Sequence, residues 1–216
     1  MDMYENAADL EKPMPEDVDQ LFDPDWQPTG ESRKSYKERL DSGFFRRFMS
    51  GPVVLDVGYR GYESESNPVL RHAIGVDTGY PGYDGRRLPF DDGTVDCVYS
   101  SHLLEHVVDP GETIRDWYRV LRVGGHIVTV VPHQHLYEKK LEPPSRFNGD
   151  HKRFYTPGRL LAEFEIALQP NSFRVRHLKD NDRGHDYSIP PEKHSNWCYE
   201  IELVIEKIAR VPWELS

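Results

Sequence analysis

The chain has 216 residues, which is enough for one well-buried core and small for two. Its net charge of −10 is concentrated in residues 1–31, which hold ten acids against one base, so the rest of the chain carries about −1. A nearly neutral folded part gives no support to a nucleic-acid partner. The apolar stretches have only strand length and the two cysteines lie far apart, which argues against a membrane span and a disulfide framework. We therefore expect a reduced, cytoplasmic protein.

Residues 1–31 are predicted to form an acidic arm outside the folded domain. Their four prolines disfavour a helix and favour an extended or disordered chain. No basic segment followed by an apolar one marks a signal for export. A second interpretation stays open, in which the arm docks on the core or on a second subunit through its apolar residues Met3, Tyr4, Leu21, Phe22 and Trp26. A homo-oligomer formed through the arm is therefore among the expected assemblies.

Residues 32–49 are predicted to be a capping helix at the start of a single domain, residues 32–216. Apolar residues recur at positions 36, 40, 44 and 48, and Ser42-Gly43 interrupts them. Six lysines and arginines alternate with these positions. One interpretation packs the apolar face on a sheet. The other closes the helix over a cofactor, with its basic face toward an anionic substrate.

Short apolar runs then alternate with helix signals. Three runs predict strands, at 53–58, 73–77 and 95–100. Asp109 as N-cap and Pro110 in the first turn mark the start of a helix, and Gly124-Gly125 is predicted to end it. The apolar run at 127–132 predicts a further buried strand. Strands alternating with helices indicate an α/β fold with a mostly parallel sheet.

The last part of the chain is predicted to complete the sheet. A polar loop at 133–155 precedes a helix that Thr156-Pro157 opens. Two further strands are predicted at 173–178 and 199–208. The second of these alternates apolar and charged residues, which suits an antiparallel edge pair at the C-terminal end of the sheet.

Asp77 is the most informative candidate site residue. It ends the second apolar run, 21 positions after Asp56 in the first. An acid at the tip of the second strand can accept hydrogen bonds from the two hydroxyls of a ribose, as in dinucleotide-binding folds. The pattern therefore predicts a cofactor that contains a nucleoside.

Four segments, taken in order, resemble the class I S-adenosylmethionine-dependent methyltransferases, in particular the type 11 group. They are LDVG at 55–58, GVD at 75–77, DGRRLPFDDGTVD at 84–96, and SHLLEHV at 101–107 followed by RVLRVGG at 119–125. The ordered set is much more specific than a lone LDxG. It implies a Rossmann-like sheet and S-adenosyl-L-methionine as the cofactor.

The resemblance also implies which residues contact that cofactor. Asp77 corresponds to the acid that binds the ribose, and the segment from Asp84 to Leu88 corresponds to the one beside the adenine. The full implied set is Asp56, Gly58, Arg60, Gly61, Asp77, Asp84, Gly85, Leu88, Ser101 and His102.

The chain departs from the family pattern in two places. Arg60 and Tyr62 stand where the family has glycines that permit positive φ and a close approach to the cofactor. We expect Arg60 to bring its guanidinium to the methionyl carboxylate instead; the rival interpretation is a lost cofactor site. Only six residues separate Asp77 from Asp84, which leaves no room for the family's usual second helix and third strand.

Methyl transfer to a hydroxyl needs an aligned acceptor and a base, and histidine suits the second role. His133 directly follows the 127–132 strand. Asp150-His151 opens the segment DHKRFYTP, which resembles a stretch of methyltransferases from bacterial surface-glycan gene sets. The catalytic candidates are therefore His151, supported by Asp150, and His133. For His151 a base, a substrate hydrogen bond and a structural role stay open. No metal-ligand spacing stands out among these residues and His135, so no metal is expected.

The resulting prediction is a methyltransferase that acts on a hydroxyl of a sugar or nucleotide-linked glycan. Arg146, Lys152 and Arg153 are suited to hold a phosphate of such an acceptor. Two alternatives stay open. One is N- or O-methylation of another small metabolite, and the other is a non-catalytic, methyltransferase-like binding or scaffold protein, which Arg60 and Tyr62 motivate.

Overall fold

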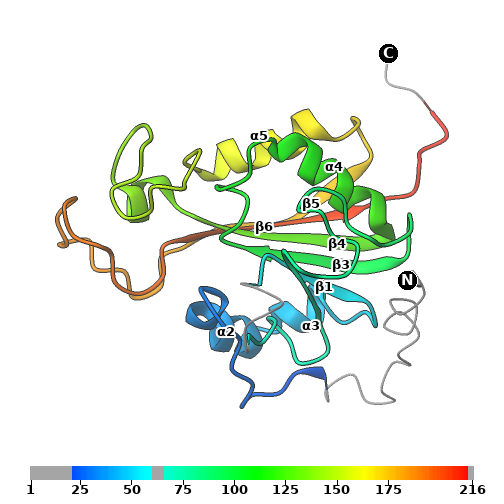
Figure 1. Ribbon diagram of the computed structural model, residues 1–216, viewed down its shortest axis with the longest axis horizontal. Coiled ribbons are helices and arrows are strands. Elements are labelled where there is room, and N and C mark those ends of the chain that lie inside the picture. The colour runs from blue at the N-terminus through cyan, green and yellow to red at the C-terminus, as the bar shows by residue number, and fades with distance from the viewer. Residues whose placement is uncertain (1–20, 60–65, 214–216) are drawn as a thin grey trace.

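The computed structural model describes residues 21–59 and 66–213, and these contain one six-stranded sheet with helices on both faces (Figure 1). The strands are β1 (Val54–Val57), β2 (Ile74–Val76), β3 (Val95–Ser101), β4 (Leu121–Pro132), β5 (Phe173–Asn181) and β6 (Glu200–Lys207). The helices are α2 (Ser32–Asp41), α3 (Phe44–Phe48), α4 (Pro110–Val120), α5 (Pro157–Ala167) and the π-helix η2 (Gln134–Glu138). The predicted Rossmann-like fold is confirmed.

The sheet is mostly parallel and ends in an antiparallel pair. Its strand order is β2-β1-β3-β4-β6-β5. The strands β2, β1, β3 and β4 run parallel, whereas β6 runs antiparallel to both β4 and β5. Parallel strands need crossover connections, and these place helices on both faces of the sheet. The carboxyl ends of β1 and β3 therefore meet at one edge, where such folds bind ligands.

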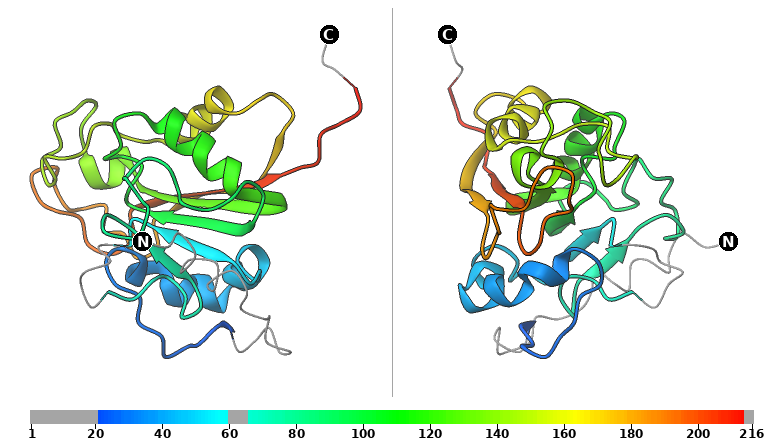
Figure 2. Two further views of the ribbon diagram at one scale, coloured as in Figure 1. Left: turned by 45° about the vertical axis from the view of Figure 1, so that its right-hand side comes forward. Right: turned by 90° about the vertical axis from the view of Figure 1, so that its left-hand side faces the viewer.

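Each face of the sheet packs against its own helices (Figures 1 and 2). On one face, Trp117 of α4 and Phe164 of α5 are buried in the cluster that contains Leu55. On the other, α2 and α3 contribute a separate cluster that includes Phe45 and Tyr99. Alternate strand residues point to opposite faces, which explains why the two clusters share β1 and β3. The apolar face of residues 32–49 thus packs on the sheet.

The described part of the N-terminal arm also contacts the core. Leu21 and Phe22 are buried in the same cluster as α3. Trp26 donates its indole N–H to the carbonyl of Pro68 at 2.9 Å. Residues 1–20 lie outside the described residues.

Gly124-Gly125 does not end helix α4, contrary to the prediction. The helix ends at Val120, and the chain passes directly into β4, which contains both glycines. A β-carbon on Gly125 would lie 2.8 Å from the carbonyl oxygen of Asp96. The glycine is therefore needed for close approach between β4 and the start of β3.

Two smaller differences concern the polar segments. Residues 134–138 of the predicted loop form η2, and β5 continues to Asn181, three residues beyond its predicted end. The shortened connection after β2 is as predicted, since residues 77–94 contain no helix or strand. None of the described helices has the length and apolarity needed to cross a membrane.

Candidate functional site

A cavity of about 350 Å³ opens where β1 and β3 end. One side is formed by Asp56 and Gly58 of the first motif together with Ser101 and His102. The lining also includes polar residues that follow His102 or come from other segments: Glu31, Glu105, His106, Tyr137, Asn148, His151, His194 and Tyr199. The cavity therefore joins the predicted cofactor motif to the segment that carries His151.

The first-motif side has the shape that a closely approaching ligand needs. Gly58 has φ of +82°, and a β-carbon there would lie 2.9 Å from the Leu103 side chain. Only glycine fits that position without strain. Ser101 has a buried hydroxyl oxygen with no hydrogen-bond partner among the described residues, and it lines the same cavity. A turn without a side chain beside an unpaired polar atom fits the methionine part of S-adenosylmethionine.

Asp56 is a buried acid at this side of the cavity. Its carboxylate accepts the main-chain N–H of Val69 at 2.5 Å. Burial raises the pKa of Asp56 to about 7; the hydrogen bond from Val69 opposes that rise, and the charge of Asp77 adds to it. A cationic ligand group bound nearby would stabilise its ionised form.

The residues predicted to contact the ribose and adenine lie along the β2–β3 connection rather than in the cavity lining. Asp77 directly follows β2 and accepts the N–H of Thr78 at 2.7 Å. Asp84 is exposed and accepts the N–H groups of Arg86 and Arg87, both at 2.8 Å, and these bonds lower its pKa. Gly85, with φ of +83°, and the buried Leu88 complete this segment. The predicted contacts of Arg60 and Gly61 lie outside the described residues.

Glu105 is a second buried acid that lines the cavity. Its side chain is fully buried and faces three imidazoles. Its Oε1 lies 3.8 Å from Nδ1 of His102, 3.7 Å from Nε2 of His106 and 3.9 Å from Nε2 of His151. Burial raises the pKa of Glu105, although the neighbouring histidines oppose that rise.

His151 is held by Glu138 rather than by Asp150. The Nδ1 atom of His151 forms a hydrogen bond with Oε1 of Glu138, and both side chains are buried. Asp150 is exposed, and its N–H binds the side chain of Asn148. The support that the sequence assigned to Asp150 is thus provided by an acid of η2, because the turn at 148–151 directs the Asp150 side chain toward solvent.

Arg153 fixes the loop that carries Glu105 and His106. Its guanidinium donates to the carbonyls of Leu104, Val107 and Val108. These N–H groups are therefore engaged within the protein, whereas an arginine that binds a phosphate needs N–H groups free to donate to it. The prediction that Arg153 holds a phosphate does not fit this position, because the carbonyls of a tight loop occupy the guanidinium.

His133 lies outside the cavity lining. Its Nδ1 accepts the N–H of His135 at 3.0 Å, and its Nε2 is 3.2 Å from Oδ1 of Asp180. Burial lowers the pKa of His133, although Asp180 opposes that change. The structure thus places His151, and not His133, in the lining of the cavity to which Ser101 and His102 also contribute.

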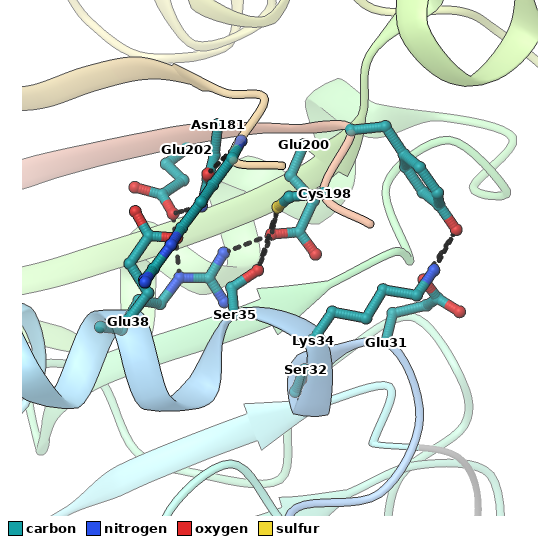
Figure 3. A network of polar contacts seen from close by, with 12 residues as sticks. Glu31, Ser32, Lys34, Ser35, Glu38, Asn181, Cys198, Glu200 and Glu202 are labelled. Atoms are coloured by element: carbon teal, nitrogen blue, oxygen red, sulfur yellow. Dashed lines mark hydrogen bonds and ion pairs between the residues drawn. The ribbon is translucent and has the colours of Figure 1, made fainter. Parts of the chain in front are cut away.

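Glu31 precedes helix α2, and a buried ionic network fixes this helix against β6. We call this network the α2–β6 clamp; it is formed by Ser35, Arg39, Glu200 and Glu202. Arg39 donates to Glu200 at 2.7 Å and to Glu202 at 3.1 Å. Figure 3 shows Ser35 on α2 directed toward Glu200, to which it donates at 2.5 Å. Burial alone would raise the pKa of Glu202, but its hydrogen bond with His177 and the charge of Arg39 lower it to about 2.

Glu200 connects the clamp to the cavity. Its second carboxylate oxygen is 3.5 Å from Nε2 of His102. Burial disfavours a charged His102, but the carboxylates of Glu200 and Glu105 outweigh it and raise the pKa of His102. His102 also has φ of +53°, a conformation that non-glycine residues adopt rarely and that is concentrated at functional sites.

Sequence reasoning missed several residues of the site. Glu105 stood within the SHLLEHV segment, so the resemblance itself was the signal that could have found it. Glu138 had no such signal, because a single acid in a polar stretch has no distinctive spacing. Glu31, Tyr137 and Tyr199 come from three separate segments and meet only in the folded chain.

The chain matches the family described as Methyltransferase domain over residues 71–129, from just before β2 into β4. The Hahella chejuensis ubiquinone/menaquinone biosynthesis C-methyltransferase UbiE is 33% identical over 82 residues, 38% of this chain and 33% of that protein. A Mycolicibacterium smegmatis protein described as a probable S-adenosylmethionine-dependent methyltransferase is 27% identical over 188 residues, with 76% of this chain and 68% of that protein covered. The chain spans about a third or less of the length of several curated relatives that it matches.

A solved structure shows the same fold over nearly the whole chain. The crystal structure of the [4+2]-cyclase SpnF has a TM-score of 0.55 and 16% identity, and 95% of each chain is covered. Because that protein is a cyclase, this likeness concerns the fold and not the reaction. The matched family and the two named relatives are thus methyltransferases, and the Mycolicibacterium relative is described as S-adenosylmethionine-dependent.

Proposed function

We propose that this chain is an S-adenosylmethionine-dependent methyltransferase that methylates a hydroxyl of a sugar or of a nucleotide-linked glycan. One observation carries the proposal: a single cavity joins the first motif, Asp56 and Gly58, to a buried histidine and glutamate cluster around His151. A methyl acceptor must reach the cofactor at such a junction. The many hydroxyl, imidazole and carboxylate groups of the lining favour an acceptor rich in hydroxyls.

Five residues are proposed to hold the cofactor. Asp77 binds the ribose hydroxyls, and Asp84 with the following main chain lies beside the adenine. Gly58, Ser101 and His102 surround the methionine part. S-adenosylmethionine, when bound, supplies an electrophilic methyl group on a sulfonium.

His151 is proposed to be the base or the acceptor anchor. Its Nδ1 is bound to Glu138, which leaves Nε2 directed toward Glu105 and the cavity. A neutral imidazole that donates from Nδ1 to a carboxylate presents an unprotonated Nε2. That atom can accept a proton from an acceptor hydroxyl, or hold the hydroxyl in line for attack.

Methylation of another small metabolite at nitrogen or oxygen is the second candidate. The Hahella relative is named as a C-methyltransferase, so it methylates carbon and not a hydroxyl. Similarity to that relative therefore does not fix the acceptor atom of this chain, and this second candidate stays open. A non-catalytic scaffold is the rival from another class.

Calorimetry with S-adenosylmethionine tests the cofactor assignment. We expect the wild-type chain to bind, and Asp77→Ala to weaken binding by roughly 1.5–3 kcal/mol, the range for hydrogen bonds to a charged group. Asp91→Ala, which removes an exposed acid of the same connection, is the control and should bind like the wild type. Absence of binding to the folded wild type would favour the scaffold.

A panel of nucleotide sugars tests the acceptor, with release of S-adenosylhomocysteine as the readout. With an active acceptor, His151→Ala should lower turnover by about 10²–10⁴-fold, the range for a lost general base, and leave cofactor affinity nearly unchanged. His133→Ala should cost less, because His133 does not line the cavity. Activity on simple amines but on no sugar would replace the glycan assignment by the second candidate.

A further inference from the structure

Three side chains in the cavity have the arrangement of metal ligands. One ligand atom each from Glu105, His106 and His151 lies within 4.8 Å of the other two. Oε1 of Glu105 is 3.7 Å from Nε2 of His106 and 3.9 Å from Nε2 of His151. Donors bound to one ion at about 2.0–2.2 Å lie about 3.3 Å apart at a tetrahedral angle. Shifts of about one ångström or less in these side chains would therefore bring all three atoms to that spacing around an ion.

The surroundings of Glu105 point to a ligand independently. Its side chain is fully buried, and neither carboxylate oxygen accepts a hydrogen bond from any residue in 21–59 or 66–213. Buried carboxylates are normally hydrogen-bonded, paired with a cation or bound to a metal, because an isolated one is costly. Arg153 lies two residues after His151, but its guanidinium donates to the main-chain carbonyls of Leu104 and Val108 and not to the Glu105 carboxylate.

The contact between His151 and Glu138 completes the pattern of a metal site. Metal-bound histidines usually donate their other ring N–H to a carboxylate or a carbonyl, which fixes the tautomer and the ring orientation. Glu138 provides such a carboxylate, and its side chain is buried. The Nε2 atom of His151 is thereby directed to Glu105 as an electron-pair donor.

We propose that Glu105, His106 and His151 bind one divalent transition-metal ion, such as Zn²⁺, with Glu138 orienting His151. Two histidines and one carboxylate leave coordination positions open, as in catalytic sites. His106 is partly exposed, and the set faces the cavity, so an oxygen of an acceptor can occupy an open position.

The role of the ion, unlike its binding, rests on the proposed methyl transfer. A metal ion lowers the pKa of a hydroxyl bound to it, so that the hydroxyl proton can leave to water. His151 would then be a metal ligand and acceptor anchor rather than the base. The carboxylate of Glu105, which accepts no hydrogen bond from the described residues, would supply the negative charge that binds the ion.

The test uses the full chain, freed of metal with a chelator and titrated with Zn²⁺ alone in a calorimeter. We expect one equivalent to bind, with Glu105→Gln and His106→Ala weakening binding by roughly 100-fold or more and Glu138→Gln by about 10–100-fold. His135→Ala removes an exposed histidine at the same end of the molecule and should change nothing. Co²⁺ should give visible absorption bands that disappear in Glu105→Gln.

Circular dichroism of each variant establishes that it is folded, and His106→Ala carries little risk because its side chain is 30% exposed. Absence of stoichiometric Zn²⁺ binding to the wild type overturns the metal site, and so does binding by His106→Ala and Glu105→Gln that is as tight as that of the wild type. S-adenosylmethionine binding is measured separately. Cofactor binding without Zn²⁺ binding would remove only the metal site, and the reverse result would remove only the proposed methyl transfer.

Discussion

Two regions of the molecule bury charged side chains: the α2–β6 clamp and the Glu105 cluster, which consists of Glu105, His106 and His151. They differ in how completely those charges are paired. In the clamp, Arg39 donates to two carboxylates, and Glu202 also accepts from Asn181 at 3.0 Å; of the clamp's carboxylate oxygens, Oε1 of Glu200, which faces His102, accepts no hydrogen bond within the described residues. In the cluster, Glu105 faces three imidazoles at 3.7–3.9 Å, beyond hydrogen-bond length. The two regions lie on either side of His102.

This difference separates a structural role from a functional one. Buried polar networks whose groups are satisfied rigidify a fold, whereas an unpaired buried group needs an explanation, such as a catalytic role or an ion. The clamp fixes α2 against β6 and so positions one wall of the cavity. The Glu105 cluster holds polar atoms that the described protein itself does not satisfy.

The largest effect is expected in the clamp. Arg39→Met should lower the free energy of unfolding by about 3–5 kcal/mol, because it leaves two buried carboxylates without their cation. The control is Lys37→Met on the same helix, whose ion pair with Asp41 is exposed; it should change stability by about 0.5 kcal/mol or less. Urea unfolding measures both. Similar losses in the two variants would show that the clamp is not a special source of stability.

Opposite pH dependences are expected from Glu202 of the clamp and Asp56 of the first motif. Glu202, with a folded pKa of about 2, stabilises the fold above its unfolded value near 4.3, and this contribution is lost as the pH falls toward 2. Asp56, with a folded pKa of about 7, contributes stability below about pH 4 that is lost as the pH rises through 7.

Asp56→Asn isolates the second of these contributions. Relative to the wild type, this variant should gain about 1.4 kcal/mol of stability per pH unit between pH 5 and 7 and little above that range. The asparagine oxygen can still accept the N–H of Val69, so the hydrogen bond is retained. Unfolding in urea at four pH values provides the measurement, and parallel curves for the two proteins would contradict the shifted pKa.

The smallest effect is expected in the cavity. Glu105→Gln should leave metal-free protein as stable as the wild type or more stable by about 1 kcal/mol, since it removes a buried charge that lacks a hydrogen-bond donor. Thermal unfolding in the presence of a chelator measures this change. A loss of several kcal/mol would mean that Glu105 is paired like the clamp residues and would erase the contrast between the two regions.

The fold was predictable from local signals. Apolar runs of strand length located β1 to β4, and the N-caps Asp109 and Thr156, each followed by proline, located the starts of α4 and α5. Gly124-Gly125 misled because a glycine pair after a helix pattern usually ends the helix. The reason for Gly125 is its distance to the main chain of Asp96, which no local pattern contains.

The candidate site was predictable only in part, because its contacts join distant segments. The pairing of His151 with Glu138 and the approach of His151 to Glu105 depend on how residues 133–155 fold next to the end of β3. No metal was predicted, because no metal-ligand spacing stands out among His133, His135, Asp150 and His151. The proposed ligands Glu105 and His106 lie outside that segment. The bond between Arg39 and Glu200 spans 161 positions and leaves no sequence signature.

The short connection after β2 also has a consequence for self-association. Without a further strand beyond it in the described sheet, β2 is an edge strand, and edge strands expose main-chain groups to which another chain can pair. It is only three residues long, so it offers few such groups. The opposite edge, β5, is nine residues long but carries Arg174, Arg176 and Lys179 and a register irregularity after Val175. The short length of β2 limits pairing at one edge of the sheet. At the other edge, the basic side chains of β5 and its irregular register disfavour pairing with another chain.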